Sequence, residues 1–172
     1  SRVETPFFLI LPHDDVLHHR SVELLLSEVE GDPGASVAYA DMSVFGACAP
    51  HRKLVDLPRD GTREEQLLEF FLAGAEAVPW RGVTRSAVIP RLGGFPTDGF
   101  LGFAVECEWA LGLIVEGRAI RVPRPIYCKR ILPPSSLTAS RERIEGRGRE
   151  RLLAAWERHR AVMLAKTARA VP

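Results

Sequence analysis

The chain has few cysteines and no long apolar run, and these two absences exclude several classes of protein. Cys48, Cys107 and Cys128 are odd in number, widely spaced and never arranged as a C-x-x-C pair. A disulfide framework and a cysteine-rich zinc site are therefore disfavoured. No apolar stretch approaches the ~20 residues of a membrane-spanning helix. We therefore expect a cytoplasmic protein in a reducing compartment.

The chain also lacks a charge imbalance. It contains 23 Lys and Arg residues against 22 Asp and Glu residues, which gives a formal net charge of +1. The overall charge therefore indicates no particular partner. Basic side chains do gather at residues 141–169, where glutamates alternate with them. This alternation favours a solvated helix face, and we expect no nucleic-acid ligand; peripheral membrane contact through acidic lipid is the alternative.

Helical and extended patterns alternate along the chain, which predicts an α/β fold. We expect a domain at residues 1–134 and a helical tail at residues 135–172. Helices are expected at residues 19–30, 62–74 and 104–116, and strands at residues 7–11, 36–45, 82–84, 119–122 and 125–130. Residues 50–58 are expected to form an extended crossing segment or a loop. Thr62 and Glu65 have the spacing of a capping box, and Gly117 is expected to end the third helix.

The tail is expected to form one long helix or two, with a break at Gly146 and Gly148. Its apolar residues have helical spacing, so they would pack on the domain or on a second copy of the chain. The second arrangement predicts a homodimer through the tail. The residues concerned are Leu152, Leu153, Trp156 and Met163.

A pair of adjacent acids, Asp14 and Asp15, follows the first apolar run. The run at residues 7–11 has the length and composition of a fully buried strand, and open α/β sheets bind ligands beyond the carboxyl ends of such strands. Two neighbouring carboxylates repel each other unless a cation neutralises them, and oxygen ligands favour Mg²⁺, Mn²⁺ or Ca²⁺. The alternative is a solvated turn in which Asp14 or Asp15 caps the next helix.

A second acidic pair follows a glycine-rich loop. Gly93 and Gly94 lie in this loop, whose spacing matches neither a P-loop nor a dinucleotide-binding fingerprint. Glu106 and Glu108 then open the next helix, and because they are two residues apart they point to different sides of it. We therefore expect only one of them to face a cleft. The alternative is that both simply stabilise the positive end of the helix dipole.

Taken in order, these features resemble the second half of a family 2 glycosyltransferase with the GT-A fold. They are an apolar strand ending in acids, a helix, a strand, a Gly-Gly-Phe loop, an acidic helix start and an extended Arg-Ala-Ile-Arg-Val-Pro-Arg-Pro-Ile-Tyr segment. The likeness covers about residues 7–130. The His13-Asp14-Asp15 turn is similar to that of a subgroup with a His-Asp-Asp motif. The expected architecture is therefore a partial GT-A fold with a C-terminal helical tail.

The resemblance implies a reaction. A nucleotide-diphosphate sugar donor would give its sugar to an acceptor hydroxyl with inversion, and a divalent metal, Mn²⁺ or Mg²⁺, would bridge the diphosphate. The family's metal-binding acids map to Asp14 and Asp15, with His13 as a further donor-binding residue. Its catalytic base, which takes the proton of the acceptor hydroxyl, maps to Glu106. Asp98 on the loop is the second candidate for the base, and Glu108 is the third.

The chain departs from the family pattern at three places. Pro12 stands where many members carry the first acid of their motif, so the metal has one ligand fewer or His13 contributes; a hydrogen bond from His13 to backbone or phosphate is the alternative. Val105-Glu106 replaces an acidic pair. The half that binds the nucleotide base does not precede Ser1. We therefore expect little or no transferase activity from this polypeptide alone.

Two other functions compete with this interpretation. A non-catalytic binding or oligomerisation module could keep the same fold without supporting chemistry. A metal-dependent hydrolase could act on phosphate esters through Asp14 and Asp15.

Overall fold

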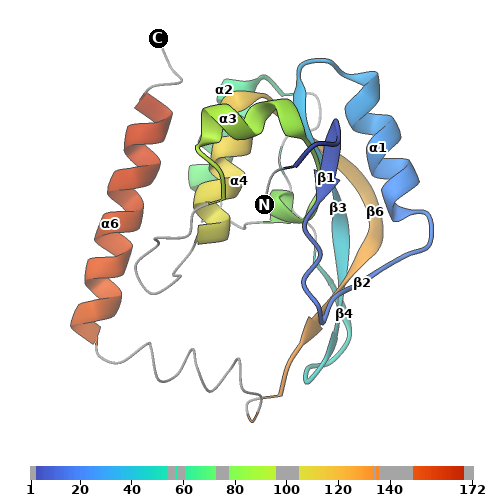
Figure 1. Cartoon of the computed structure of the whole chain (residues 1–172). Coiled ribbons are helices and arrows are strands. Elements are labelled where there is room, and N and C mark those ends of the chain that lie inside the picture. The colour runs from blue at the N-terminus through green and yellow to red at the C-terminus, as the bar shows by residue number, and fades with distance from the viewer. Residues whose placement is uncertain are drawn as a thin grey trace.

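The computed structural model describes residues 3–53, 57, 61–72, 78–95, 105–133, 135 and 149–168. Within these ranges a curled mixed sheet lies between helices, so the predicted α/β class is confirmed (Figure 1). The strands are β1 (Phe7–Leu9), β2 (Val16–Leu17), β3 (Ala35–Gly46), β4 (His51–Lys53), β5 (Val83–Arg85) and β6 (Arg118–Ile131). The helices are α1 (Ser21–Gly31), α2 (Arg63–Leu72), α3 (Ile89–Leu92), α4 (Val105–Glu116) and α6 (Arg149–Ala168), with 3₁₀ turns η1 (Val78–Arg81) and η2 (Ser86–Val88).

The sheet is built on two long strands. Its order is β1-β5-β3-β6-β2, and β4 adds a short antiparallel pairing with β3. The long strands β3 and β6 are parallel, whereas every other pairing is antiparallel. The two strands predicted at residues 119–122 and 125–130 are one continuous strand, β6. Residues 50–58, predicted as an extended segment or a loop, contain β4.

The prediction of a fully buried strand at residues 7–11 is wrong. The strand observed is shorter, each of its three residues is only partly buried, and within the described residues it pairs with β5 alone at one edge of the sheet. Phe8 packs on the core beneath α4, while Phe7 and Leu9 pack on the core beneath α1. The continuous apolar run therefore reflects two covered faces at an edge position rather than a central strand.

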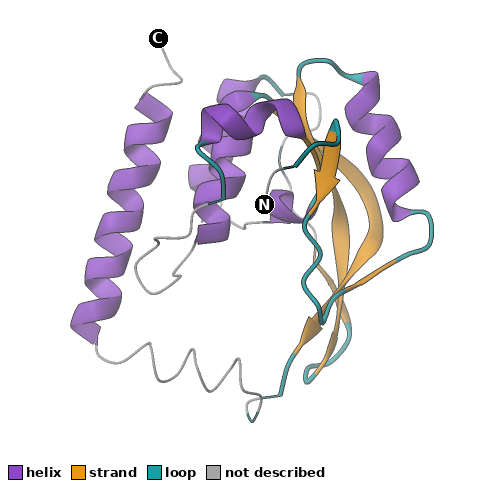
Figure 2. Cartoon of the chain, viewed as in Figure 1, coloured by secondary structure: helices purple, strands orange, loops and turns teal. Residues whose placement is uncertain are grey.

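Two hydrophobic cores sit on opposite faces of the sheet (Figure 2). One lies between the sheet and α2 and α4, and includes Tyr39, Leu111 and Ile114; the other lies beneath α1 and includes Leu25 and Val29. The crossover between β3 and β6 is fixed to the sheet by Gln66 of α2. This buried amide exchanges two hydrogen bonds with the backbone of Ala119, of 2.8 and 2.9 Å. The tilt of α2 against β6 is therefore specified by a polar contact as well as by packing.

The structure confirms two predicted helix boundaries, the start of α2 and the end of α4. The backbone N–H of Glu65 donates to the Thr62 hydroxyl at 3.2 Å, and the Thr62 N–H donates to the Glu65 carboxylate at 2.7 Å, which is a capping box. Helix α4 stops before Gly117, which lies against another segment of chain. A Cβ at this position would approach the Gly34 carbonyl oxygen at 2.8 Å and the Ser36 nitrogen at 2.9 Å, so only glycine fits.

The tail helix α6 packs against α4 of the same chain. Met163 joins the core cluster of α4, and His159 faces Glu108. Packing on the domain is thus observed for Met163, whereas the side chains of residues 152, 153 and 156 and the backbone of Gly146 and Gly148 lie outside the described parts of the chain. No helix in the described ranges combines the length and apolarity needed to cross a membrane.

Candidate functional site

The acid pair is carried across the sheet by the segment between β1 and β2. Strand β1 lies at one edge of the sheet and β2 at the other, where Val16 and Leu17 pair with β6. The Asp15 N–H donates to the Pro12 carbonyl at 3.1 Å and closes a turn over the two acids. Pro12 is the first residue of this turn, and His13 and Asp14 are its two central residues. The acids lie beside β6, not beyond the end of β1.

Asp15 is the anchor of this turn. Its side chain is only 3% exposed, and both carboxylate oxygens accept hydrogen bonds. Oδ2 accepts from the Tyr127 hydroxyl at 2.7 Å and from Arg81 Nε at 3.4 Å, while Oδ1 accepts from the Arg130 N–H at 2.9 Å. A buried carboxylate requires this kind of compensation. Asp15 therefore joins three separate parts of the chain: the turn, η1 and β6.

Asp14 and His13 differ from Asp15 in their surroundings. Asp14 is partly exposed and His13 is exposed. No hydrogen bond or ion pair to Asp14 is found within the described part of the chain. Helix α1 does not use either acid as a cap, because its first turn is held by Ser21, whose N–H and hydroxyl both donate to the His18 carbonyl. The turn thus presents one carboxylate outward and buries the other.

Lys129 of β6 links this turn to the start of α4. Burial, together with the nearby charges of Arg81 and Lys53, lowers the pKa of the Lys129 ammonium below its usual range. The carboxylates of Asp15 and Glu106 act in the opposite direction. Charges influence each other this way only at short range in water. The charges of Asp15 and Glu106, which are far apart in the sequence, therefore both act on the same lysine.

Tyr127 and Lys129 project from the same face of β6, because side chains alternate along a strand. Burial, and then the hydrogen bond to Asp15, raise the pKa of the Tyr127 phenol well above its usual range, so it remains a neutral donor. Arg81 lies near this pair, with its guanidinium carbon 5.9 Å from the Tyr127 ring centroid and 4.4 Å from the Trp80 ring centroid.

Sequence reasoning missed Arg81, Tyr127 and Lys129 as site residues. The sequence did contain one indication for Tyr127 and Lys129. They are two residues apart on a predicted strand, so their side chains lie on the same face. Arg81 gave no such signal, because it belongs to a short 3₁₀ turn whose position depends on the tertiary fold.

The two glutamates at the start of α4 have different neighbours. Glu106 is partly buried and interacts with Lys129. Glu108 is turned toward the tail helix, where its Oε1 lies 3.7 Å from His159 Nδ1. Cys107, between them, is partly exposed. Of the two glutamates, Glu106 is therefore the one associated with the acid turn.

The Gly-Gly-Phe loop is fastened by its aromatic residue. Gly93 and Gly94 adopt φ values of +75° and +86°, which favour glycine, and they turn the chain after α3. Phe95 then packs between two indoles, with ring-centroid distances of 6.2 Å to Trp80 and 5.4 Å to Trp109. Trp109 is only 3% exposed, so its indole is part of the hydrophobic core. Asp98, the second candidate for the base, lies outside the described residues.

The residues present fit a divalent metal only in part. Among the described residues, no three His, Cys, Asp or Glu side chains are grouped to hold an ion. Asp15 is a poor direct ligand, because three donors already occupy its oxygens and the Arg81 guanidinium would repel a cation. Asp14 is suitable, since Mg²⁺ is often held by one or two carboxylates together with substrate phosphates. Asp14 is therefore the residue that would hold a metal here.

Comparison with known proteins gives no family for this chain. No protein-family model matches it, and no curated protein is similar to it at a significant level. The resemblance to family 2 glycosyltransferases therefore stays a prediction from the sequence motifs.

Proposed function

We propose that this chain is the metal- and acceptor-binding part of a family 2 type glycosyltransferase with a GT-A fold, acting on a nucleotide-diphosphate sugar and an acceptor hydroxyl. The observation that carries the proposal is that Asp15 in the acid turn and Glu106 at the start of α4 both lie within electrostatic range of Lys129. These are the two motifs to which the resemblance assigns donor binding and base catalysis. Because they are separated by most of the domain, their approach is not a consequence of sequence proximity.

The charges around Lys129 suit a diphosphate. Lys129 and its two cationic neighbours, Arg81 and Lys53, carry three positive charges. The carboxylates of Asp15 and Glu106 contribute two negative charges to the same surroundings. Arginine and lysine bind phosphate oxygens with charge-assisted hydrogen bonds. The positive excess would stabilise the negative charge that develops on the departing diphosphate during sugar transfer.

Asp14 and Glu106 would have the two chemical roles. Asp14 would hold the metal, which supplies Lewis-acid stabilisation of the leaving group when bound. Glu106 would accept the proton of the acceptor hydroxyl as its oxygen attacks the sugar. Asp15 would position Asp14 by fixing the turn to β6, and Asp98 is the remaining alternative for the base.

Pyrophosphate is the probe that separates this site from a nucleotide pocket. We expect calorimetry to detect pyrophosphate binding that becomes about tenfold tighter with Mn²⁺, and we expect Asp14→Asn to abolish this metal dependence. Glu142→Gln, a matched loss of one acidic charge in the tail, should retain it. Metal-independent binding in the wild-type protein, or an unchanged Asp14→Asn variant, would contradict the proposal.

The same sample distinguishes the competing functions. Release of inorganic phosphate from pyrophosphate or simple phosphate esters would favour a hydrolase. Failure to bind pyrophosphate at all would favour a non-catalytic module. Sugar transfer from a panel of nucleotide-diphosphate hexoses, lost in Glu106→Gln, would identify the reaction directly.

A further inference from the structure

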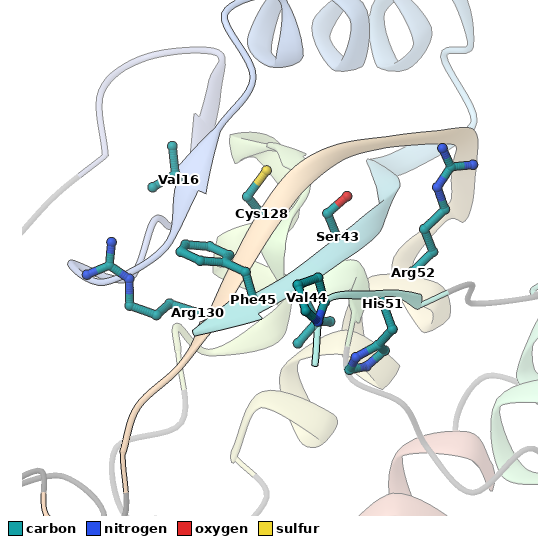
Figure 3. A pocket seen from close by; sticks show the side chains of 9 residues that line it. Val16, Ser43, Val44, Phe45, His51, Arg52, Cys128 and Arg130 are labelled. Atoms are coloured by element: carbon teal, nitrogen blue, oxygen red, sulfur yellow. The ribbon is translucent and has the colours of Figure 1, made fainter. Parts of the chain in front are cut away.

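A separate cavity of about 540 Å³ lies on the other face of β6 from Tyr127 and Lys129. Its lining includes Cys128 and Arg130, which alternate with those two residues along the strand. Figure 3 shows Cys128, Ser43 and Phe45 in its centre, with Arg130 and Arg52 toward its two ends. A cavity of this volume is within the range of small-molecule sites.

Strand register explains how these side chains come together. Ser43 of β3 pairs with Arg52 of β4 on one side and with Cys128 of β6 on the other, and Cys128 pairs with Val16 of β2. Directly paired residues project from the same face of a sheet, so these four form one row across four strands.

Phe45 and Arg130 form the next row, since they are paired in the same register and lie two residues further along their strands. Arg130 covers the Phe45 ring, with its guanidinium carbon 5.2 Å from the ring centroid. The floor of the cavity is therefore set by the backbone pairing of long strands, not by a loop.

The cavity has an apolar floor and a basic border. Val16 is 47% exposed, so its side chain adds accessible apolar surface to the cavity. No aspartate or glutamate is among the described residues that line it, although His51, Arg52 and Arg130 do. Arg52 has no ion pair within the described part of the chain. Guanidinium groups beside apolar surface, without a carboxylate, are complementary to an anion that has an apolar body.

We propose that this cavity binds an organic phosphate with a hydrocarbon body. The phosphate would be held by Arg52 or Arg130, and the hydrocarbon would cover Val16, Phe45 and the Cys128 side chain. The proposal does not depend on the glycosyltransferase assignment, because the two sites use opposite faces of β6. Arg130 contributes to both in different ways, since its backbone N–H holds Asp15 while its side chain borders the cavity.

Cys128 provides a reporter inside the cavity. In a Cys48→Ser, Cys107→Ser background it is the only thiol, and its rate of reaction with N-ethylmaleimide measures access to the floor. We expect monomeric octyl phosphate to slow this reaction in a saturable manner, whereas inorganic phosphate and octyl glucoside protect at least about tenfold more weakly, because each lacks one half of the interaction.

Arginine variants test the charge requirement. Either Arg52→Gln or Arg130→Gln should weaken protection by octyl phosphate by about tenfold, the value expected for one charge-assisted hydrogen bond, and full protection in both variants would overturn the proposal. Arg124→Gln is the matched control, because Arg124 is an exposed arginine of the same strand that does not line the cavity. Circular dichroism would verify that each variant is folded, and the exposed position of Arg52 on a short edge strand makes that variant the least disruptive.

Several results would overturn the proposal. Equal protection by octyl glucoside would show an apolar site without anion recognition, and an equal loss in Arg124→Gln would show a non-specific charge effect. Protection that rises with protein concentration and needs no ligand would make this face an interface between copies of the chain. If octyl phosphate protects, vesicles of phosphatidic acid compared with phosphatidylcholine identify the source, because protection by the former alone indicates a lipid headgroup and no protection by either indicates a free organic phosphate.

Discussion

Replacing Asp15 with alanine is expected to lower the free energy of unfolding by about 3–5 kcal/mol, as is found when one partner of a buried charge network is removed. The substitution would leave the Arg81 guanidinium, the Tyr127 hydroxyl and the Arg130 N–H without their acceptor. These groups belong to η1 and β6, so the loss also releases the turn from the sheet. Urea unfolding followed by circular dichroism measures the effect.

Asp14→Ala is the matched control for this experiment. It removes the same charge from the adjacent residue, but the Asp14 carboxylate has no hydrogen-bond partner among the described residues. We expect a change in unfolding free energy within about 0.5 kcal/mol, as for ordinary surface substitutions. The structural assignment of Asp15 is refuted if both variants lose the same stability, or if Asp15→Ala unfolds at the wild-type urea concentration.

The contrast between the two acids bears on how the motif would work. The sequence motif does not distinguish Asp14 from Asp15. In the structure, Asp14 is partly exposed, whereas the Asp15 carboxylate is buried and hydrogen-bonded. If the stability and pyrophosphate measurements separate as expected, Asp14→Asn loses metal-dependent binding without losing stability. Asp15→Ala loses stability, and its binding defect follows from the displaced turn.

Local interactions were the part of this fold that the sequence predicted well. The capping box at Thr62 and Glu65 involves four consecutive residues, and Gly117 was recognised because a glycine after an apolar helix commonly ends it. The centres of α1, β3, α2 and α4 were predicted for the same reason, because hydrophobic period depends on neighbouring residues.

Long-range geometry could not be obtained in this way. Asp15 and Tyr127 are 112 residues apart, and nothing local to either indicates that they are hydrogen-bonded. The edge position of β1 depends on the order of strands in the sheet, to which an apolar run gives no clue. Arg81 and Lys129, which belong to the proposed site, were missed for this reason, whereas Asp14 and Glu106 were predicted because a known motif order included them.

Lys129→Met is expected to weaken pyrophosphate binding by about tenfold to a hundredfold, the value for loss of a charge-assisted hydrogen bond to phosphate. The same substitution should raise the melting temperature of the ligand-free protein by a few degrees. Burial and the charges of Arg81 and Lys53 disfavour the Lys129 ammonium, and its lowered pKa records that penalty. A methionine of similar length fills the position without carrying the charge. Calorimetry and thermal unfolding measure the two effects.

The pH dependence of the unfolding free energy distinguishes removal of the Lys129 charge from simple repacking around the new methionine. Because the pKa of Lys129 is lowered in the folded protein relative to the usual value of 10.5, the unfolded chain binds more protons in the interval between the two values. The unfolding free energy of the wild-type protein therefore gains from this group as pH rises through that interval. The stability advantage of Lys129→Met should be full at neutral pH and should shrink as pH approaches 10.5.

Lys166→Met is the control, since it removes a lysine charge from α6, the outer helix that packs against α4. It should leave pyrophosphate binding unchanged. Equal loss of binding in both lysine variants would mean that pyrophosphate senses only the total charge of the protein. A Lys129→Met variant that binds normally would remove Lys129 from the site, and with it the observation that joins the acid turn to Glu106. Loss of binding together with greater stability is the combination expected of a residue that is kept for its ligand at the expense of the fold.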